Sequence, residues 1–325
     1  MEEFSKDTKL TDNILIIHNP NSGKGKGSKY ADRLVKHFTK NNIKIGCVLA
    51  STSLEFFYDF CKQNSGNANK YTLAIVIGGD GTLSPCVDAM IKNDFIVPIY
   101  PFGRGTANDF PTYMKTNKSI GRVVKIICHN TAVTYVDTLA VEHPNSLQAQ
   151  PEITYAINVA CGGAFTNGVT NYSKKSKQRF GKLAYMTKAA GEAFRMQPQI
   201  LKFTVDGKEY TYNTFLFLIL NTTNAGSIKH IIGKASPCDE RLNLAIFTNC
   251  GICGKMNIAL NTLFRRSECC EHIVHLPGKE FKVEVIGEPT KNFTHTDIDG
   301  NAGYEYPLIV KLSDKKIPIV SNRRN

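Results

Sequence analysis

Apolar residues in the first part of the chain come in short runs, and each run ends in a loop rich in glycine or polar residues. The clearest run, LAIVI at residues 73–77, leads directly into GGDGT at residues 78–82. Beyond this loop, apolar residues recur at helical spacing in Leu83, Val87, Met90 and Ile91. This order predicts a buried strand, a glycine turn and a helix.

The same order recurs along the first 138 residues. Strands are predicted over residues 13–18, 43–49, 73–77, 96–100 and 131–136, and helices over about residues 30–38, 54–63, 83–91 and 119–128. Alternating strands and helices predict a mostly parallel α/β domain. Ligands bind at the carboxyl ends of strands in such sheets, and Asp80, Asp109 and Asp137 each follow a predicted strand.

After residue 138 the pattern changes to one dominated by strands. Strand-like segments cover residues 153–160, 201–205, 210–220, 242–247, 281–286 and 306–312, and helical patterns are confined to about residues 178–194 and 255–266. These segments predict a β-rich second domain that is mainly antiparallel. The predicted boundaries are 1–138 for the α/β domain and 139–304 for the second domain. Residues from about 305 to 325 are candidates for a segment that returns to the α/β domain.

The loop at residues 78–82 has the chemistry of a phosphate site. Glycines let the backbone approach a bulky anion, and the following helix N-terminus favours negative charge. Asp80 would repel phosphate alone, but it fits if Mg²⁺ lies between carboxylate and phosphate. A left-handed turn closed by a local Asp hydrogen bond is the alternative, and the sequence leaves it open.

A second glycine loop, NPNSGKGKG at residues 19–27, follows the first predicted strand. Its spacing differs from that of a Walker A loop. Its amides, Ser22 and Lys24 could still hold phosphates. The open alternative is a flexible surface loop.

Charge favours an acidic partner. The 325-residue chain carries 40 Lys+Arg against 28 Asp+Glu, a net charge of +12, and has no Trp. Part of the excess is a run at Lys174, Lys175, Lys177, Arg179 and Lys182. Because no basic stripe is interleaved with aromatic residues, a nucleotide and an anionic membrane surface are expected rather than nucleic acid. A solvated basic surface remains the alternative.

Other features narrow the expected setting. No apolar run is long enough to span a bilayer, and the first ten residues lack the apolar core of a secretory leader. The ten cysteines are scattered, so they are expected to be reduced thiols. Cys250 and Cys253 have CxxC spacing without a second pair, which favours a plain helix start over a metal or redox site. We expect a cytoplasmic protein.

Five motifs together carry a family resemblance. They are NPNSGK at residues 19–24, GGDGTL at 78–83, GTANDF at 105–110, GKLAY at 181–185 and DIDG at 297–300. The sequence resembles the diacylglycerol kinase catalytic family, in particular the soluble bacterial lipid kinases. This resemblance implies an N-terminal nucleotide domain, a C-terminal β-sandwich domain and a cleft between them.

The resemblance also implies a set of site residues. ATP phosphates would contact Asn19, Pro20, Asn21, Ser22, Gly23, Gly79, Asp80, Gly81, Thr82, Leu83, Ser84, Pro85 and Thr106, with Thr52 on the nucleotide side. Asp80, Asp109 and Asp137 would orient the catalytic Mg²⁺ through waters, with Lys24 paired to them. A structural Mg²⁺ in the second domain would take the Asp239 side chain and the carbonyls of Ser236 and Arg241.

The chain departs from the family pattern at several positions, one of which is the segment at residues 101–106: its Phe102-Gly103-Arg104-Gly105 makes it longer than the usual Pro-x-Gly-Thr. Pro85 stands where the family usually has Glu, and Glu240 replaces a Gly, which is a source of strain if that position needs a positive φ. The family's Asp-Gly-Glu motif is Asp299-Gly300-Asn301 here, so its proposed general base is an amide. An amide does not accept a proton at neutral pH.

Three functions are therefore weighed. The favoured one is an ATP- and Mg²⁺-dependent kinase for diacylglycerol or a related lipid alcohol in phospholipid metabolism, docked transiently on the inner membrane surface. The second is a nucleotide- or lipid-binding pseudokinase, which Asn301, Pro85 and Glu240 motivate. An NAD kinase shares GGDGT, but GTANDF and the late DG motif count against it. The oligomeric state is left open.

Overall fold

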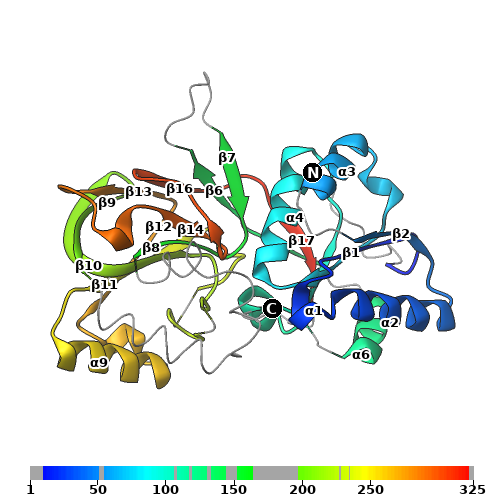
Figure 1. Ribbon diagram of the computed structural model, residues 1–325, viewed down its shortest axis with the longest axis horizontal. Helices are drawn as coiled ribbons and strands as arrows, with labels where there is room; N and C mark the ends of the chain where they lie inside the picture. Colours follow the sequence, from blue (N-terminus) through cyan, green and yellow to red (C-terminus); the bar gives the residue numbers. More distant parts are fainter. Residues whose placement is uncertain are drawn as a thin grey trace. The chain divides into compact units, whose positions relative to one another are not determined.

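The structure is a computed structural model, and it describes residues 10–50, 55–105, 108–116, 119–129, 133–143, 152–163, 197–226, 228–233 and 235–321. The chain divides into two compact units (Figure 1). The first comprises Met1–Val136 and Lys315–Asn325, and the second comprises Asp137–Asp314. The last segment of the chain thus belongs to the N-terminal unit.

A six-stranded sheet organises the first unit. Its order is β2 (Ile45–Ala50), β1 (Ile14–His18), β3 (Ala74–Gly78), β4 (Ile99–Gly103), β17 (Ile317–Val320) and β5 (Val133–Val136). Every pairing is parallel except β17 with β5. All residues of β1, β3 and β4 are buried, which is the pattern of central parallel strands covered on both faces. The predicted mostly parallel α/β fold is confirmed.

Helices connect these strands. They are α1 (Ser22–Gly25), α2 (Gly27–Lys40), α3 (Glu55–Gln63), the 3₁₀ turn η1 (Ala68–Lys70), α4 (Asp80–Lys92), α5 (Asp109–Tyr113) and α6 (Ile120–His129). In α2 the apolar face at Ala31, Leu34 and Phe38 packs in the same core as Ile75 and Phe102 of the sheet. The helical spacing of apolar residues in the sequence therefore identifies the buried face of α2.

An eleven-stranded antiparallel sheet organises the second unit. One path runs β15 (Asn301–Ala302), β14 (Thr296–Ile298), β8 (Val159–Gly163), β10 (Lys208–Leu220), β9 (Gln199–Val205), β13 (Glu280–Val285), β16 (Leu308–Leu312), β6 (Leu139–Glu142) and β7 (Ile153–Ala156). Off this path, β11 (Leu242–Thr248) pairs with β10 and with β12 (Ile273–Gly278). The predicted antiparallel β-rich fold is confirmed.

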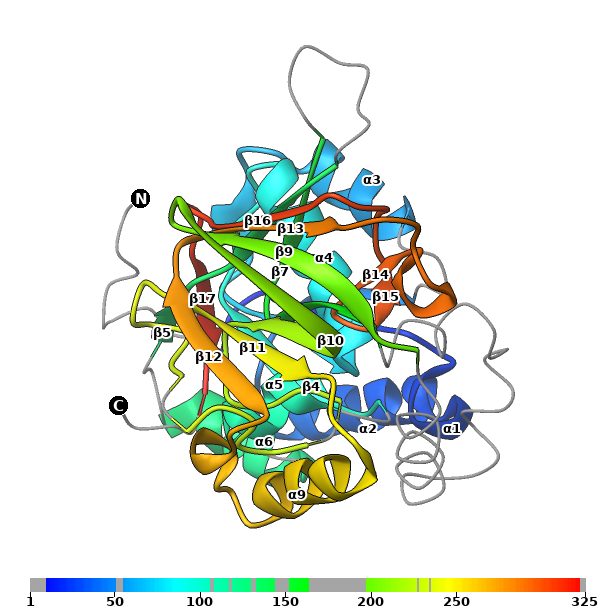
Figure 2. The same ribbon diagram turned by 90° about the vertical axis from the view of Figure 1, so that its left-hand side faces the viewer.

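The long strand β10 divides this sheet into two parts (Figure 2). Its first half pairs with β9 and its second half with β11, and the register with β11 shifts between Thr214 and Leu216. Such an irregularity bends a strand. Two cores result, one containing Phe203, Phe217 and Phe281 and the other behind α9 (Ile252–Leu263). The described part of this unit also contains the 3₁₀ turns η2 (Ser267–Cys269) and η3 (Lys291–Phe293).

Some predicted elements differ from the observed ones. Residues 153–160 form two strands, β7 and β8, rather than one. The predicted strand at residues 96–100 is Ile99–Gly103, and the loop predicted after it contains the short helix α5. The helix predicted at about residues 178–194 lies outside the described residues.

Candidate functional site

The loops that follow β1, β3 and β4 meet at one edge of the first unit's sheet, because these strands are parallel neighbours. A Cβ atom on Gly105 would lie 2.8 Å from the backbone nitrogen of Gly79, and one on Gly23 would lie 2.8 Å from the carbonyl oxygen of Arg104. The Arg104 N–H donates to the Gly78 carbonyl at 2.6 Å. Glycine is thus required where the loops touch, and Gly23 also has a φ of +58°.

The loop after β1 is held by its own backbone and by Asn19. Asn19 Oδ1 accepts the Asn21 N–H at 2.9 Å, and the Asn19 carbonyl accepts the Ser22 N–H at 3.0 Å. The Pro20 carbonyl accepts the Gly27 N–H at 3.3 Å. Ser22 Oγ is buried and has no hydrogen-bond partner among the described residues. A buried hydroxyl in that condition costs about 1–3 kcal/mol, so this atom fits contact with a phosphate oxygen.

Asp80 joins the loop after β3 to helix α5. Its Oδ2 accepts the Asp109 N–H at 2.7 Å, and its Oδ1 accepts the Phe110 N–H at 3.1 Å. These partners replace the local turn hydrogen bond left open as the alternative. The two N–H groups fix the orientation of the Asp80 carboxylate at the start of α5. Asp109 itself is buried, with 7% of its surface exposed.

The first turn of α4 contains the other residues predicted to face ATP in this loop. The Gly79 carbonyl accepts the N–H groups of Thr82 and Leu83 at 2.9 and 3.0 Å, which closes the turn. The side chains of Leu83 and Ser84 are buried in the core, at 2% and 3% exposure. Gly81 is exposed. Any contact of Leu83 or Ser84 with a ligand is therefore limited to the backbone.

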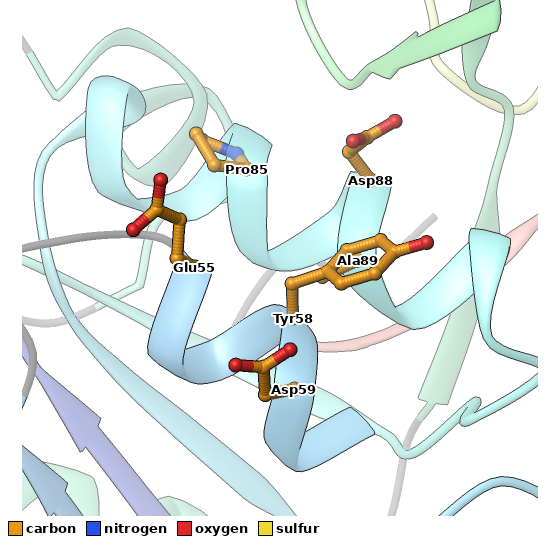
Figure 3. A pocket seen from close by; sticks show the side chains of 6 residues that line it. All are labelled: Glu55, Tyr58, Asp59, Pro85, Asp88 and Ala89. Carbon is orange, nitrogen blue, oxygen red and sulfur yellow. The ribbon is translucent and has the colours of Figure 1, made fainter. Parts of the chain in front are cut away.

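An open pocket of about 310 Å³ lies between α3 and α4 (Figure 3). Its lining residues are Glu55, Tyr58, Asp59, Pro85, Asp88 and Ala89. Three carboxylates make this pocket unsuitable for phosphate and suitable for hydrogen-bond donors, although Asp88 already pairs with Lys92 at 3.0 Å. Pro85, which was predicted on the nucleotide side, lies in its wall.

Arg104 is a cation at the glycine loops that the sequence-based prediction missed. Its guanidinium carbon lies 4.4 Å from the ring centroid of Tyr30 and 4.1 Å from that of Phe102. Partial burial lowers the pKa of Arg104, and Tyr30 and Tyr100 oppose the shift. A guanidinium remains charged at neutral pH. The signal for it was the FGRG sequence at residues 102–105, longer than the family's usual segment.

Several predicted residues cannot be placed. Thr52, Thr106 and the basic run Lys174–Lys182 lie outside the described residues. The backbone of Lys24 is in α1, but its side chain is also outside the description. The predicted pairing of Lys24 with the aspartates stays a prediction.

The prediction that Asp137 shares one sheet edge with Asp80 and Asp109 is wrong. Strand β5 is antiparallel to β17, and its last residue Val136 pairs with Ile317 at the start of β17. The end of β5 is therefore at the opposite edge of the sheet from the glycine loops. The sequence does not reveal this direction, because β17 comes from the far end of the chain.

Asp137 instead supports the turn at residues 236–241 of the second unit. It is fully buried; its Oδ2 accepts the Glu240 N–H at 2.9 Å, and its N–H donates to the Pro237 carbonyl at 2.6 Å. Asn221 Nδ2 donates to its carbonyl at 2.7 Å. Asp137 is thus tied to the segment for which a structural cation was predicted.

The residues predicted for that structural cation form a closed turn. Asp239 accepts the N–H groups of Ser236 and Arg241 at 3.3 and 3.2 Å, and the Ser236 carbonyl accepts the Asp239 N–H at 3.3 Å. Burial raises the pKa of the Asp239 carboxyl, and the charge of Asp137 raises it further. Glu240 has a φ of +57°, so the predicted need for a positive φ is confirmed.

Among the described residues, no group of three or more acidic, histidine or cysteine side chains is placed so that it could hold a metal ion, and this turn is no exception. The carbonyls of Ser236 and Arg241 and one carboxylate of Asp239 are nevertheless oxygen donors, the type that Mg²⁺ takes along with several waters. The donor set fits a partly hydrated cation.

Asp299 holds the turn that carries Asn301. Its carboxylate accepts backbone N–H groups from Ile157 at 2.8 Å, Val159 at 2.7 Å and Asn158 at 3.2 Å, and only 2% of the residue is exposed. Asp299 is therefore a positioning residue rather than one that faces a substrate. The hydrogen bonds from residues 157–159 to Asp299 also explain why the chain forms two strands here, β7 and β8, instead of one.

Asn301 itself begins β15, opposite Ile298, and is partly exposed. The Gly300 N–H donates to Asp297 Oδ1 at 2.8 Å, and Asp299 and Gly300 have φ values of +51° and +82°. The turn is thus formed with an amide side chain at the position where the family has its carboxylate.

Comparison with known proteins agrees with this geometry. Residues 13–141 match the family model described as the diacylglycerol kinase catalytic domain. Over these residues the chain is similar to that catalytic domain. Two staphylococcal relatives are each named "Putative lipid kinase": one from Staphylococcus haemolyticus is 24% identical, covering 82% of each chain, and one from Staphylococcus carnosus is 26% identical, covering 80% of this chain and 81% of the relative.

Solved structures extend the fold likeness beyond residues 13–141. A diacylglycerol kinase from Bacillus anthracis str. Sterne has a TM-score of 0.74 at 21% identity, covering 97% of this chain and 99% of that one. Yeast NADH kinase complexed with NADH has a TM-score of 0.55 at 12% identity, covering 99% of this chain and 89% of that one. The shared fold therefore includes both units.

The matched segment contains the glycine loops and the three aspartates Asp80, Asp109 and Asp137, but it ends before Asp239, Asp299 and Asn301. Those three residues lie in the second unit. No described helix combines the length and the apolar character that crossing a membrane requires.

Proposed function

We propose that this protein is an ATP- and Mg²⁺-dependent kinase that transfers the γ-phosphate of ATP to the hydroxyl of diacylglycerol or a related lipid alcohol. The observation that carries the proposal is the contact of glycine loops from three parallel strands, with Asp80 bound to the start of α5. Support also comes from the similarity of residues 13–141 to the diacylglycerol kinase catalytic domain.

ATP binding would use the first unit. The amides of the loop after β1, together with Ser22 Oγ, would contact phosphate oxygens, and the exposed first turn of α4 would add its N-terminal amides. The pocket beside Pro85 would suit the nucleoside, whose amino and hydroxyl donors complement the carboxylates of Glu55 and Asp59. Phosphate and nucleoside would thus be separated along α4.

Asp80 and Asp109 would hold hydrated Mg²⁺ at this site, and Asp239 with the Ser236 and Arg241 carbonyls would hold a second, structural Mg²⁺. When bound, Mg²⁺ neutralises phosphate charge as it is transferred. The hydrogen bonds from Asp109 and Phe110 fix the orientation of the Asp80 carboxylate, so the chain orients this ligand before ATP arrives. Lipid would bind in the second unit.

The chain lacks the family's carboxylate for accepting the proton of the lipid hydroxyl. Asn301 has no proton-accepting group, and Asp299 is occupied by three backbone N–H groups. Loss of a general base costs about 10²–10⁴-fold, while positioning and charge neutralisation remain. We therefore propose a slow kinase. A pseudokinase that binds nucleotide or lipid is the second candidate, and the amide at residue 301 is the observation that favours it.

The test is incubation with γ-labelled ATP, Mg²⁺ and a total lipid extract, followed by identification of the labelled lipid. The Asp80→Asn variant keeps one carbonyl acceptor for the α5 amides but loses the charge, so phosphoryl transfer should fall at least about 100-fold while the fold is retained. Asp12→Asn, at an exposed aspartate before β1 that pairs with Lys44, is the control and should retain transfer.

Each outcome decides between the candidates. Labelling of a lipid by the wild type but not by Asp80→Asn supports the kinase. ATP binding without labelling of any lipid supports the pseudokinase, and labelling of NAD, when NAD is supplied in place of the lipid extract, would point to the NAD kinase.

A further inference from the structure

Helix α9 presents an apolar face to solvent. Ile252, Met256 and Leu260 are 70%, 53% and 51% exposed, and Phe264, which caps the helix, is 67% exposed. These four are among the most exposed large apolar side chains of the described residues. The helix lies at the outer margin of its unit in both views (Figures 1 and 2).

The spacing of these residues makes one continuous stripe. They are four positions apart, and a helix turns by about 100° per residue, so successive members are offset by only about 40°. Ala259 and Cys253 are also exposed and fall within or beside this arc. The twelve residues of α9 span about 18 Å at 1.5 Å per residue. An apolar strip of this length differs from the isolated exposed apolar residues of ordinary surfaces.

The opposite face of α9 already anchors the helix. Ile258 is buried in the core that contains Phe215, Phe247 and Ile273. Lys255 Nζ lies 5.3 Å from the centroid of the Phe215 ring. The exposed stripe is therefore not needed to attach α9 to its unit.

Charge indicates what the stripe contacts. The segment Ile252–Leu263 contains no acidic residue, and Arg265 and Arg266, which follow Phe264, are both exposed. The whole chain has a net charge of +12. An apolar strip with cations at its end matches a helix that lies in the interface of an anionic bilayer. A second copy of the chain would bring two positive surfaces together, which disfavours self-association.

We propose that the outer face of α9 docks this protein on anionic lipid bilayers, with Ile252, Met256, Leu260 and Phe264 inserted among the lipid head groups. This proposal rests on the proposed function, which requires access to a lipid substrate. It gives the docking an apolar anchor in addition to the electrostatic attraction.

The absence of Trp provides a direct probe. In Phe264→Trp the only indole would be on the stripe, and its emission should shift to shorter wavelength when vesicles of phosphatidylglycerol and phosphatidylcholine are added. Phe56→Trp is the matched control, because Phe56 is also exposed, at 52%, but is on α3 of the other unit. Its emission should not change.

A second pair of variants tests the energetics by vesicle sedimentation without ATP. Met256→Asp with Leu260→Asp should weaken partitioning at least about tenfold, because each replaces inserted apolar surface by a charge. Ile200→Asp, at an exposed site on β9 of the same unit, should partition as the wild type does.

Vesicle binding is measured apart from catalysis, so a protein that binds vesicles but transfers no phosphate would refute the kinase and leave this docking surface standing. Unchanged emission of Phe264→Trp with vesicles would overturn the proposal. An emission shift that depends on protein concentration and needs no vesicles would overturn it in favour of self-association.

Discussion

At the scale of single residues, aspartates that look catalytic in the sequence bind the backbone in the structure. Asp80 accepts two N–H groups across 29 and 30 residues, and Asp299 accepts three across 140 to 142 residues. Asp239 accepts two within its own turn. A carboxylate with bound N–H groups has a fixed orientation, which suits a cation ligand, but its removal also costs stability.

Asn301→Glu should convert a slow kinase into a faster one. The turn is already held by Asp299 and Asp297, so the new carboxylate would appear at the position where the family has its proton acceptor. We expect turnover of the lipid substrate to rise by about 100-fold or more at fixed ATP and Mg²⁺.

Asn301→Gln is the matched control, because it has the length of Glu without the basic group, and it should stay slow. A fast wild type with no gain in Asn301→Glu would mean that another residue accepts the proton. Equal gains in both variants would mean that side-chain length, not basicity, was limiting.

His18 should make the first unit sensitive to acid. It ends β1, is 5% exposed, and its Nδ1 has no hydrogen-bond partner among the described residues. Burial lowers the pKa of His18, and the charge of Asp32 opposes this only in part. Below the usual histidine pKa of about 6.5, the unfolded chain therefore binds more protons than the folded one, and stability falls as the pH drops.

The measurement is the thermal midpoint between about pH 7.5 and pH 5.5. The midpoint of the wild type should fall, and that of His18→Phe, which cannot be protonated, should fall less. His37→Asn, at an exposed histidine of α2, should behave as the wild type does. An identical fall in all three proteins would remove His18 as the cause.

At the scale of elements, the strands with continuous apolar runs and the amphipathic helices were predictable from local periodicity. The predictions that were wrong concern segments whose structure depends on residues far away in the sequence. Residues 153–160 read as one strand because they are mostly apolar, but Asp299 binds the backbone at Ile157–Val159 and breaks the run. The end of β4 was missed because Pro101 and Gly103 are typical of turns, whereas in the structure they lie between buried neighbouring strands.

In the candidate site, too, the local features could be predicted from the sequence and the long-range contacts could not. The glycine loops could be predicted, because each directly follows an apolar strand. The bonds from Asp80 to α5 could not, since a five-residue helix has too little periodicity to detect. The position of Asp137 could not either, because the direction of β5 is set by pairing with a strand some 180 residues later.

Glu240→Gly should stabilise the second unit. Glu240 has a φ of +57°, a conformation that costs a non-glycine residue about 1–2 kcal/mol. Glycine removes this strain but loses about 0.5–1 kcal/mol through the flexibility of the unfolded chain. We expect a net gain of up to about 1 kcal/mol, seen as a thermal midpoint about 2–4 °C higher.

Glu240→Ala is the control for this turn, because it removes the carboxylate but keeps the Cβ atom. It should gain nothing. If Glu240→Ala were stabilised as much as Glu240→Gly, the charge of Glu240 beside Asp137 and Asp239 would be the cause rather than the backbone.

At the scale of the whole molecule, the chain's two ends belong to one unit. Strand β17 enters the first unit's sheet between β4 and β5, pairing Ile319 with Ile99 and Ile317 with Val136. Every residue of β17 is buried. The second unit is therefore an insertion, and the first cannot complete its sheet until the end of the chain is present.

Removal of residues 315–325 should therefore unfold the first unit while leaving the second. Without β17, the buried strands β4 and β5 lose their shared partner, and their backbone N–H and C=O groups become unpaired edges. Amide hydrogen exchange should show lost protection in β1, β3 and β4, whereas β9, β10 and β13, which lie in the continuous segment Asp137–Asp314, should keep theirs.

Truncation after Ser321 is the matched control and should leave both units protected, because it keeps β17 whole. Retained protection of β3 and β4 in the longer truncation would show that β17 only borders a sheet that folds without it, and loss of protection in β9 and β10 would show that the second unit depends on the first.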